Sequence, residues 1–284
     1  MALATVNGLT LGYEVLGEGR DWAITPGGRF SRDSPGVRQL ALELADRGNR
    51  VLIWDRPNCG ESDVCFDGES ESEMQADALA GLLAHLDMAP AVIAGGSGGS
   101  RVSLLTAARH REVAGGLALW WISGGVYGLM ALAPHYCGGS LAAAWTGGME
   151  AVADLPDWSE ALGRNSGNRQ RILDQDPKRF IVAMEGWMKA YCPRDGQHVP
   201  GLPDALLSQL DVPALVFRSG TSDPHHTRET SQALARLLPN SRLVEPPWGD
   251  REWLERQQTS SEGLFARWPL LTPLLQEWSS EVLK

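Results

Sequence analysis

Short apolar runs alternate with segments of helical spacing along the first part of the chain. An apolar run of about four to eight residues, bounded by turn residues, is typical of a buried strand. Such runs occupy residues 9–16, 22–25, 51–54, 91–94 and 114–123, and helical spacing is found over 35–47 and 71–86. This alternation predicts an α/β fold with a mostly parallel sheet that helices cover on both faces.

The alternation stops in the middle of the chain. Residues 126–210 contain several helical segments and no convincing strand, whereas strand and helix patterns alternate again further on. We therefore predict a core made of residues 1–125 and 211–284, with residues 126–210 inserted as an α-helical cap. Such a cap would lie over the carboxyl ends of the strands, where α/β proteins bind their ligands.

One glycine-rich segment carries the strongest chemical signal. Residues 95–99 read Gly-Gly-Ser-Gly-Gly, so Ser97 stands at the centre of a G-x-S-x-G pattern. The expected strand 91–94 precedes it and a helix-compatible run over 101–108 follows it, which is the context of a nucleophile elbow. The sharp turn at an elbow strains the serine backbone and needs small neighbours. We predict that Ser97 is a nucleophile whose hydroxyl stands clear of the sheet.

Further segments make the chain resemble the α/β-hydrolase superfamily, in particular its small-molecule esterases and C–C bond hydrolases. The small-residue loop after the third strand matches residues 26–29, and the loop after the fourth strand matches residues 55–62. The elbow matches residues 95–99, and the acid loop after the seventh strand matches residues 218–223. The resemblance covers nearly the whole chain and implies the α/β-hydrolase fold. It also implies an oxyanion hole formed by the backbone N–H groups of Gly28 and Gly98.

The resemblance fails at the position of the catalytic base. The superfamily has a Gly-His pair after the last strand, and this chain has Asp250 where the histidine is expected. His225 and His226 instead follow Asp223 on the neighbouring loop. Because triads are defined by geometry and role rather than by chain order, we consider an exchange of places. His226 or His225 would be the base for Ser97, and Asp250 or Asp223 would orient it; both histidines also fit an ordinary position before a helix.

The cap is rich in large side chains, which predicts an apolar or aromatic pocket above Ser97. A guanidinium group could anchor a substrate carboxylate, and Arg29, Arg56 and Arg101 are candidates for this role. Arg29 is the most interesting of the three because it adjoins the expected oxyanion loop. The predicted substrate-binding residues are Arg29, Trp120, Trp121, Tyr127, His135 and Trp145.

Composition excludes several kinds of partner. The formal net charge of −10 and the pI of about 5.1 argue against nucleic acid and anionic membranes as partners. No segment has the length of a membrane span and the first residues lack a signal-peptide core, so we expect a cytoplasmic protein. The four cysteines have no C-x-x-C spacing and are expected to be free thiols. We expect no cofactor and no metal, and the sequence leaves a homo-oligomer open.

These features predict a serine hydrolase that acts on a small, largely apolar or aromatic carbonyl compound. The substrate would be an ester, a lactone or a vinylogous C–C bond, cleaved through an acyl-enzyme on Ser97. The alternative is a non-hydrolytic member of the fold, because the fold alone does not determine the activity. A lyase, a cofactor-free oxygenase and a ligand-binding protein belong to this alternative, which the missing Gly-His pair supports.

Overall fold

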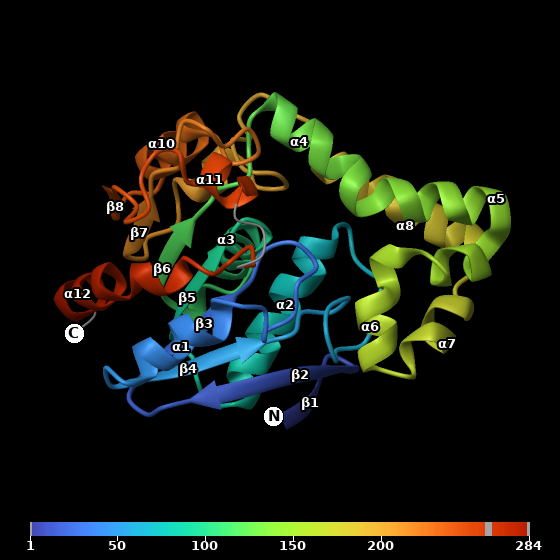
Figure 1. Ribbon diagram of the computed structural model, residues 1–284, viewed down its shortest axis with the longest axis horizontal. Helices are drawn as coiled ribbons and strands as arrows, with labels where there is room; N and C mark the ends of the chain where they lie inside the picture. Colours follow the sequence, from blue (N-terminus) through green and yellow to red (C-terminus); the bar gives the residue numbers. More distant parts are fainter. Residues whose placement is uncertain (1, 259–262, 283–284) are drawn as a thin grey trace.

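In the computed structural model, which describes residues 2–258 and 263–282, eight strands form one sheet in the order β1-β2-β4-β3-β5-β6-β7-β8 (Figure 1). β2 is antiparallel to both of its neighbours, and the pairs from β4 to β8 are all parallel. The strands are β1 (Ala2–Val6), β2 (Leu9–Leu16), β3 (Arg20–Thr25), β4 (Asn49–Trp54), β5 (Ala91–Gly96), β6 (Ala114–Trp120), β7 (Ala214–Phe217) and β8 (Ser241–Val244). This is the mostly parallel sheet that the sequence predicts.

Helices cover both faces of the sheet because alternate side chains of each buried strand point in opposite directions. Ile24 and Ile53 belong to one apolar cluster, whereas their neighbours Ala23 and Leu52 belong to the other. Helices α1 (Val37–Ala45) and α12 (Thr272–Val282) pack on the first face, and α2 (Glu71–His85), α3 (Gly98–Arg109) and α10 (Arg228–Leu237) on the second. Two short elements, η1 (Arg111–Val113) and η5 (Trp268–Leu271), are 3₁₀ turns.

Residues 126–210, which we call the cap, form helices and turns between β6 and β7. Its helices are α4 (Val126–Ala133), α5 (Gly139–Ala153), α6 (Ser159–Arg164), α7 (Asn168–Leu173), α8 (Pro177–Ala190) and α9 (Asp204–Leu207), with a π-helical turn over Pro134–Gly138 and a 3₁₀ turn over Pro156–Trp158. In Figure 1, α4 runs above the sheet, and α5, α6, α7 and α8 lie at the right of the view. Trp158, Phe180 and Met184 are buried in an apolar cluster separate from the two clusters of the sheet. Asp176 accepts a hydrogen bond from Arg179 N and caps α8, with Pro177 as its first residue.

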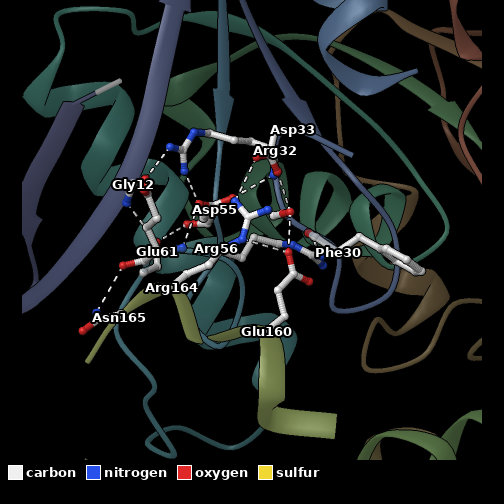
Figure 2. Close-up of polar contacts among 12 residues, drawn as sticks. Gly12, Phe30, Arg32, Asp33, Asp55, Arg56, Glu61, Glu160, Arg164 and Asn165 are labelled. Carbon is white, nitrogen blue, oxygen red and sulfur yellow. Dashed lines mark hydrogen bonds and ion pairs between the residues drawn. The ribbon is translucent and has the colours of Figure 1, made fainter. Parts of the chain in front are cut away.

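A polar network attaches one end of the cap to the core (Figure 2). Asp55, at the end of β4, accepts hydrogen bonds from the backbone N–H of Arg32 at 2.7 Å and of Glu61 at 3.0 Å. Arg32 also forms side-chain ion pairs with Asp55 and Glu61. The cap adds Arg164, whose Nη1 lies 2.9 Å from Asp33, and Asn165, which donates to the Glu61 carbonyl at 3.1 Å. The loop after β4 is therefore held between the core and helix α6.

No helix among the described residues has the length and apolar character needed to cross a membrane.

Candidate active site

Ser97 occupies the turn between β5 and α3, where the sequence predicts a nucleophile elbow. Its backbone lies in the left-handed half of conformational space, with φ 58° and ψ −123°, which is a strained conformation for a residue with a side chain. The backbone N–H of Ser97 donates to the carbonyls of Trp120 at 3.2 Å and Trp121 at 3.0 Å. The turn is therefore held by the end of β6, and the Ser97 side chain remains half-buried.

The glycines around Ser97 are required by close backbone packing. A Cβ atom on Gly99 would lie 2.0 Å from the carbonyl oxygen of Thr25, and one on Gly95 would lie 2.6 Å from the carbonyl carbon of Gly99. A Cβ atom on Gly96 would lie 2.2 Å from Nε1 of Trp120. Because these contacts are shorter than van der Waals separation, alanine at any of the three positions would displace the elbow.

A chain of hydrogen bonds joins Ser97 to a histidine and an aspartate of the loop after β7. Nε2 of His226 lies 2.8 Å from Oγ of Ser97, and Nδ1 of His226 lies 2.7 Å from Oδ2 of Asp223. The side chains of His226 and Asp223 are 6% and 3% exposed. With the proton on Nδ1, which the carboxylate favours, Nε2 is free to accept a proton from the serine.

The Asp223 carboxylate is fixed by backbone donors as well as by the imidazole. Its Oδ1 accepts hydrogen bonds from the N–H groups of His225 at 2.9 Å and His226 at 3.0 Å. Burial alone would raise the pKa of Asp223, but the charge and hydrogen bond of His226, with these two N–H donors, hold the pKa below its usual range. Asp223 is therefore ionised and can stabilise a positively charged His226.

Two backbone N–H groups lie where an oxyanion hole is expected. Gly98 is the first residue of α3, so its N–H has no acceptor within the helix. A Cβ atom on Gly98 would lie 3.5 Å from the backbone nitrogen of Gly28, which places the two residues side by side. Gly28 has φ 55°, a conformation that glycine adopts without strain.

The structure does not bring Asp250 to either histidine, contrary to one of the predicted exchanges. Its Oδ1 lies 2.8 Å from Arg218 and 2.6 Å from Arg228, and its side chain is 43% exposed. Hydrogen bonds from Arg228 and Arg218 lower the pKa of Asp250. Two arginines of the neighbouring loop and helix thus attract this carboxylate away from the site.

His225 points away from the chain of hydrogen bonds. Its ring lies 5.6 Å from that of Tyr127 and 5.3 Å from that of Trp253. Its buried Nδ1 has no hydrogen-bond partner among the described residues. Burial and the adjacent His226 lower the pKa of His225, so its ring is neutral near pH 7.

Among the predicted aromatic residues, Trp121 contacts His226. Its ring stacks on His226, with centroids 6.2 Å apart and an interplanar angle of 25°. Trp120, in the same apolar cluster, is fully buried against Trp268 and Phe217. The prediction that Trp120 binds substrate is corrected on this ground.

The predicted residues of the cap differ from the prediction in the opposite way, because they are exposed to solvent. Tyr127 and Trp145 are 66% and 67% exposed, so they do not enclose a pocket. His135 is also exposed and lies against the edge of Tyr136. The helical spacing of these residues could not indicate which side of each helix faces the core.

Arg29 is neutralised by a carboxylate of the protein. Its Nε and Nη2 lie 3.2 and 3.4 Å from the two carboxylate oxygens of Glu71, and Nη2 also donates to the Tyr136 carbonyl at 2.8 Å. The guanidinium group stacks on Trp158 with its Cζ 4.4 Å from the ring centroid. Arg29 therefore joins the cap to α2. The prediction that Arg29 binds a substrate carboxylate is corrected, because Glu71 already neutralises its charge.

All four cysteines are unpaired, as the sequence predicts. Burial raises the pKa of the Cys59 and Cys137 thiols to about 12 and that of Cys65 to about 11. These three thiols are therefore protonated and unreactive near neutral pH. No group of His, Cys, Asp and Glu side chains that could hold a metal ion occurs in residues 2–258 and 263–282.

Helix α11 (Glu252–Gln258), which the sequence analysis does not predict, adds residues beside the histidine. The Trp253 ring lies 5.8 Å from that of His226, and Arg256 stacks between Trp121 and Trp253 with its Cζ 4.2 and 4.7 Å from the two rings. Arg256 Nε lies 2.6 Å from Glu252, and both side chains are buried. The helix-forming residues of this segment are a weak signal for the helix, and nothing in the sequence indicates its contact with His226.

Comparison with known proteins identifies the fold. No protein-family model matches the chain, and no curated protein matches it. Solved structures match over nearly the full length of both chains. An esterase from Thermogutta terrifontis is 23% identical with a TM-score of 0.62, and the match covers 100% of this chain and 99% of the esterase.

Two further matches have the same extent. An enol-lactonase from Burkholderia xenovorans LB400 is 22% identical with a TM-score of 0.59, and the match covers 98% of this chain and 100% of the other. A meta-cleavage product hydrolase from Pseudomonas fluorescens IP01 is 19% identical with a TM-score of 0.60, covering 99% of this chain and 98% of the other. The chain therefore has the α/β-hydrolase fold, and the prediction of this fold is confirmed.

Proposed function

We propose that the protein is a serine hydrolase that cleaves a small, largely apolar or aromatic carbonyl compound through an acyl-enzyme on Ser97. The bond cleaved would be that of an ester or lactone, or a vinylogous C–C bond. The observation that carries the proposal is the unbroken chain of hydrogen bonds from Ser97 Oγ through His226 to Asp223. The esterase, the enol-lactonase and the meta-cleavage product hydrolase of the same fold support this class of reaction.

The proposed reaction has two steps. His226 Nε2 takes the proton of Ser97 as Oγ attacks the carbonyl carbon, and the N–H groups of Gly28 and Gly98 stabilise the resulting oxyanion. His226 then gives the proton to the leaving group, and the acyl group stays on Ser97. In the second step His226 takes a proton from water as its oxygen attacks the acyl carbon. His226 then returns the proton to Ser97 Oγ as the bond to the acyl group breaks and the acid leaves. Asp223 stabilises the imidazolium in both steps.

The contact between His226 and Ser97 supports hydrolysis against the non-hydrolytic alternative. The non-hydrolytic alternative depends on the missing histidine after the last strand. A histidine from the loop after β7 can perform the same proton transfers, because the role depends on geometry and not on position in the chain. No separate observation favours a lyase, an oxygenase or a binding protein.

Labelling with a fluorophosphonate tests the proposal directly, because only an activated serine reacts with this probe at a useful rate. We expect the wild-type protein to be modified at Ser97, and both Ser97→Ala and His226→Ala to remain unmodified. Ser166→Ala, which removes an exposed hydroxyl of the cap, is the matched control and should be labelled like the wild type. Equal labelling of the wild type and Ser97→Ala would reject the proposed nucleophile.

A further inference from the structure

Two buried guanidinium groups near the site have no carboxylate partner. Arg56 and Arg101 are 2% and 6% exposed, and within the described part of the chain neither forms an ion pair. Nη2 of Arg56 donates to the Gly28 carbonyl at 2.6 Å and to the Gly27 carbonyl at 3.2 Å. Figure 2 shows Arg56 beside Phe30, which belongs to the same loop after β3 as Gly27 and Gly28. All of these acceptors are neutral.

Arg101 is held in a similar way. Its Nε donates to Ser72 Oγ at 2.8 Å, its Nη2 donates to the Tyr191 hydroxyl at 2.7 Å, and its Cζ stacks 4.6 Å from the Tyr191 ring centroid. Nε of Arg56 and Nη1 of Arg101 are buried and have no hydrogen-bond partner among the described residues. A guanidinium group keeps its charge at all ordinary pH values, and a buried charge without a counter-ion is costly. The two side chains thus leave positive charge and free donors in the interior.

The free donors of Arg56 lie next to the expected oxyanion hole. Nη1 of Arg56 is 3.6 Å from the position that a Cβ atom on Gly98 would take, and the Tyr136 hydroxyl is 3.8 Å from it. The backbone nitrogen of Gly28 is 3.5 Å from the same point. The Tyr136 ring also stacks on that of Tyr191, with centroids 5.7 Å apart, and so joins the Arg56 and Arg101 groups. Because α3 begins at Gly98, the positive end of its dipole adds to the charge of Arg56.

Arg29, in the same region, provides an internal comparison. Glu71 neutralises Arg29, and Asn58 donates a hydrogen bond of 2.9 Å to the same carboxylate. Glu71 is thus occupied by Arg29 and leaves the charge of Arg56 and Arg101 uncompensated. The local balance is one paired guanidinium group and two unpaired ones, which favours a negatively charged ligand.

We propose that Arg56 and Tyr136 bind a carboxylate carried on the acyl part of the substrate, with Arg101 adding to the positive field behind them. The proposal rests on the proposed function, because the oxyanion hole gives the position of the scissile carbonyl. A substrate of this class is a half-ester or an acidic lactone with a second acid group a few bonds from the carbonyl. Its carbonyl oxygen occupies the donors of Gly28 and Gly98, and its carboxylate lies beside them on Arg56 Nη1 and the Tyr136 hydroxyl.

A pair of esters that differ in one charge tests the proposal. Mono(4-nitrophenyl) glutarate carries a free carboxylate on the acyl chain, and its methyl ester has the same chain without the charge. We expect the wild-type kcat/KM to be at least about tenfold higher for the anionic ester, mainly through a lower KM, since charge-assisted hydrogen bonds are strong. Raising the salt concentration should change this preference little, because the groups are buried.

Two variants assign the preference to its residues. Arg56→Gln should reduce the ratio of the two kcat/KM values about tenfold or more, and Tyr136→Phe should reduce it by a smaller factor. Because Arg56 also holds the oxyanion loop, a purely structural or oxyanion role would slow both esters equally and leave the ratio unchanged. That outcome, or an absent preference in a wild type that is labelled at Ser97, overturns the carboxylate site and leaves the proposed function standing.

Direct binding keeps the two proposals separate. In the Ser97→Ala variant, which cannot form an acyl-enzyme, calorimetry should detect monomethyl glutarate and give at least about tenfold weaker binding for dimethyl glutarate. Arg56→Gln in the same background should abolish this difference. If Ser97 fails to react with the fluorophosphonate and this selective binding persists, the hydrolase proposal fails alone. If both glutarate esters bind equally or not at all, the carboxylate site is wrong.

Discussion

Two loops at adjacent strand ends each carry a carboxylate, but only one of them faces a histidine. The loop after β7, residues 218–227, holds Asp223, whose side chain is 3% exposed and lies 2.7 Å from His226. The loop after β8, residues 245–251, holds Asp250, whose side chain is 43% exposed and contacts Arg218 and Arg228. The first carboxylate is enclosed, whereas the second is open to water and paired with two partly buried arginines.

The two loops differ in how closely they hold an acid to a histidine. In the loop after β7 the acid and the histidine are three residues apart, and the same carboxylate binds both the backbone of that turn and the imidazole. Thr227 then caps α10 by accepting a hydrogen bond from Thr230 N. One tight turn thus sets the geometry of both groups. The loop after β8 brings no histidine to Ser97, and helix α11 behind it packs against His226 through Trp253.

The largest expected effect distinguishes the two histidines of the first loop. His226→Ala should lower kcat/KM for 4-nitrophenyl acetate by about 10⁴- to 10⁶-fold, because the serine loses its base. His225→Ala should change it by no more than about threefold, because this ring points toward Tyr127 and Trp253. Steady-state kinetics of both variants measure the contrast. A comparable fall in His225→Ala would mean that the histidine beside Ser97 is not the base.

The second prediction compares the two carboxylates. Asp223→Asn should lower kcat by about 10³- to 10⁴-fold, because an amide neither stabilises the imidazolium nor holds the productive tautomer. Asp250→Asn should leave kcat nearly unchanged. The measurement is the same ester assay, with circular dichroism to verify the fold of both variants. A large effect of Asp250→Asn with a small effect of Asp223→Asn would instead make Asp250 the carboxylate that orients the base.

The sequence predicts the sheet and the elbow, and it limits the candidate base to His225 and His226, because these features depend on local pattern. The apolar runs and glycines identify β2 to β6 and Ser97. The turn Asn7-Gly8 at the β1–β2 hairpin has the positive φ values that this dipeptide favours. The expected strand 114–123 ends early at Trp120, because Trp121 turns away with φ 49°.

Orientation between elements is what the sequence could not supply. Which aspartate contacts the histidine depends on tertiary contacts, because Arg218 and Arg228 pair with Asp250 and leave Asp223 to His226. The same holds for Trp120 and Trp145, which aromatic content alone assigns to a pocket and which the fold buries or exposes. Arg29 and Arg56 are equally basic in sequence, and only the position of Glu71 separates their roles.

A third prediction examines the support that α11 gives to His226. Arg256→Met leaves Glu252 buried without its partner. Burial raises the pKa of Glu252 to about 7, so the carboxyl can take up a proton, and the free energy of unfolding should fall by about 1–3 kcal/mol. The double variant Glu252→Leu with Arg256→Met should recover most of this loss, because a buried ion pair and an apolar pair of similar size have similar stability. Chemical denaturation measures both. Equal stability of Arg256→Met and the wild type would show that the pair does not anchor α11 to Trp121 and His226.

The smallest expected effect is a pH dependence that separates the two carboxylates again. The pKa of Asp223 is lowered in the folded protein, so the unfolded chain binds more protons as the pH falls through about 4. The stability that this carboxylate contributes is therefore complete above about pH 5 and is lost at lower pH. We expect the stability difference between the wild type and Asp223→Asn to shrink as the pH is lowered from 5 to 3.

The pKa of Asp250 is lowered as well, so the stability difference between the wild type and Asp250→Asn should also shrink as the pH falls. Because Asp250 is exposed, 0.5 M salt should remove its pH dependence and leave that of Asp223. Denaturation curves at both salt concentrations test this, and equal salt sensitivity of the two variants would contradict the enclosed position of Asp223.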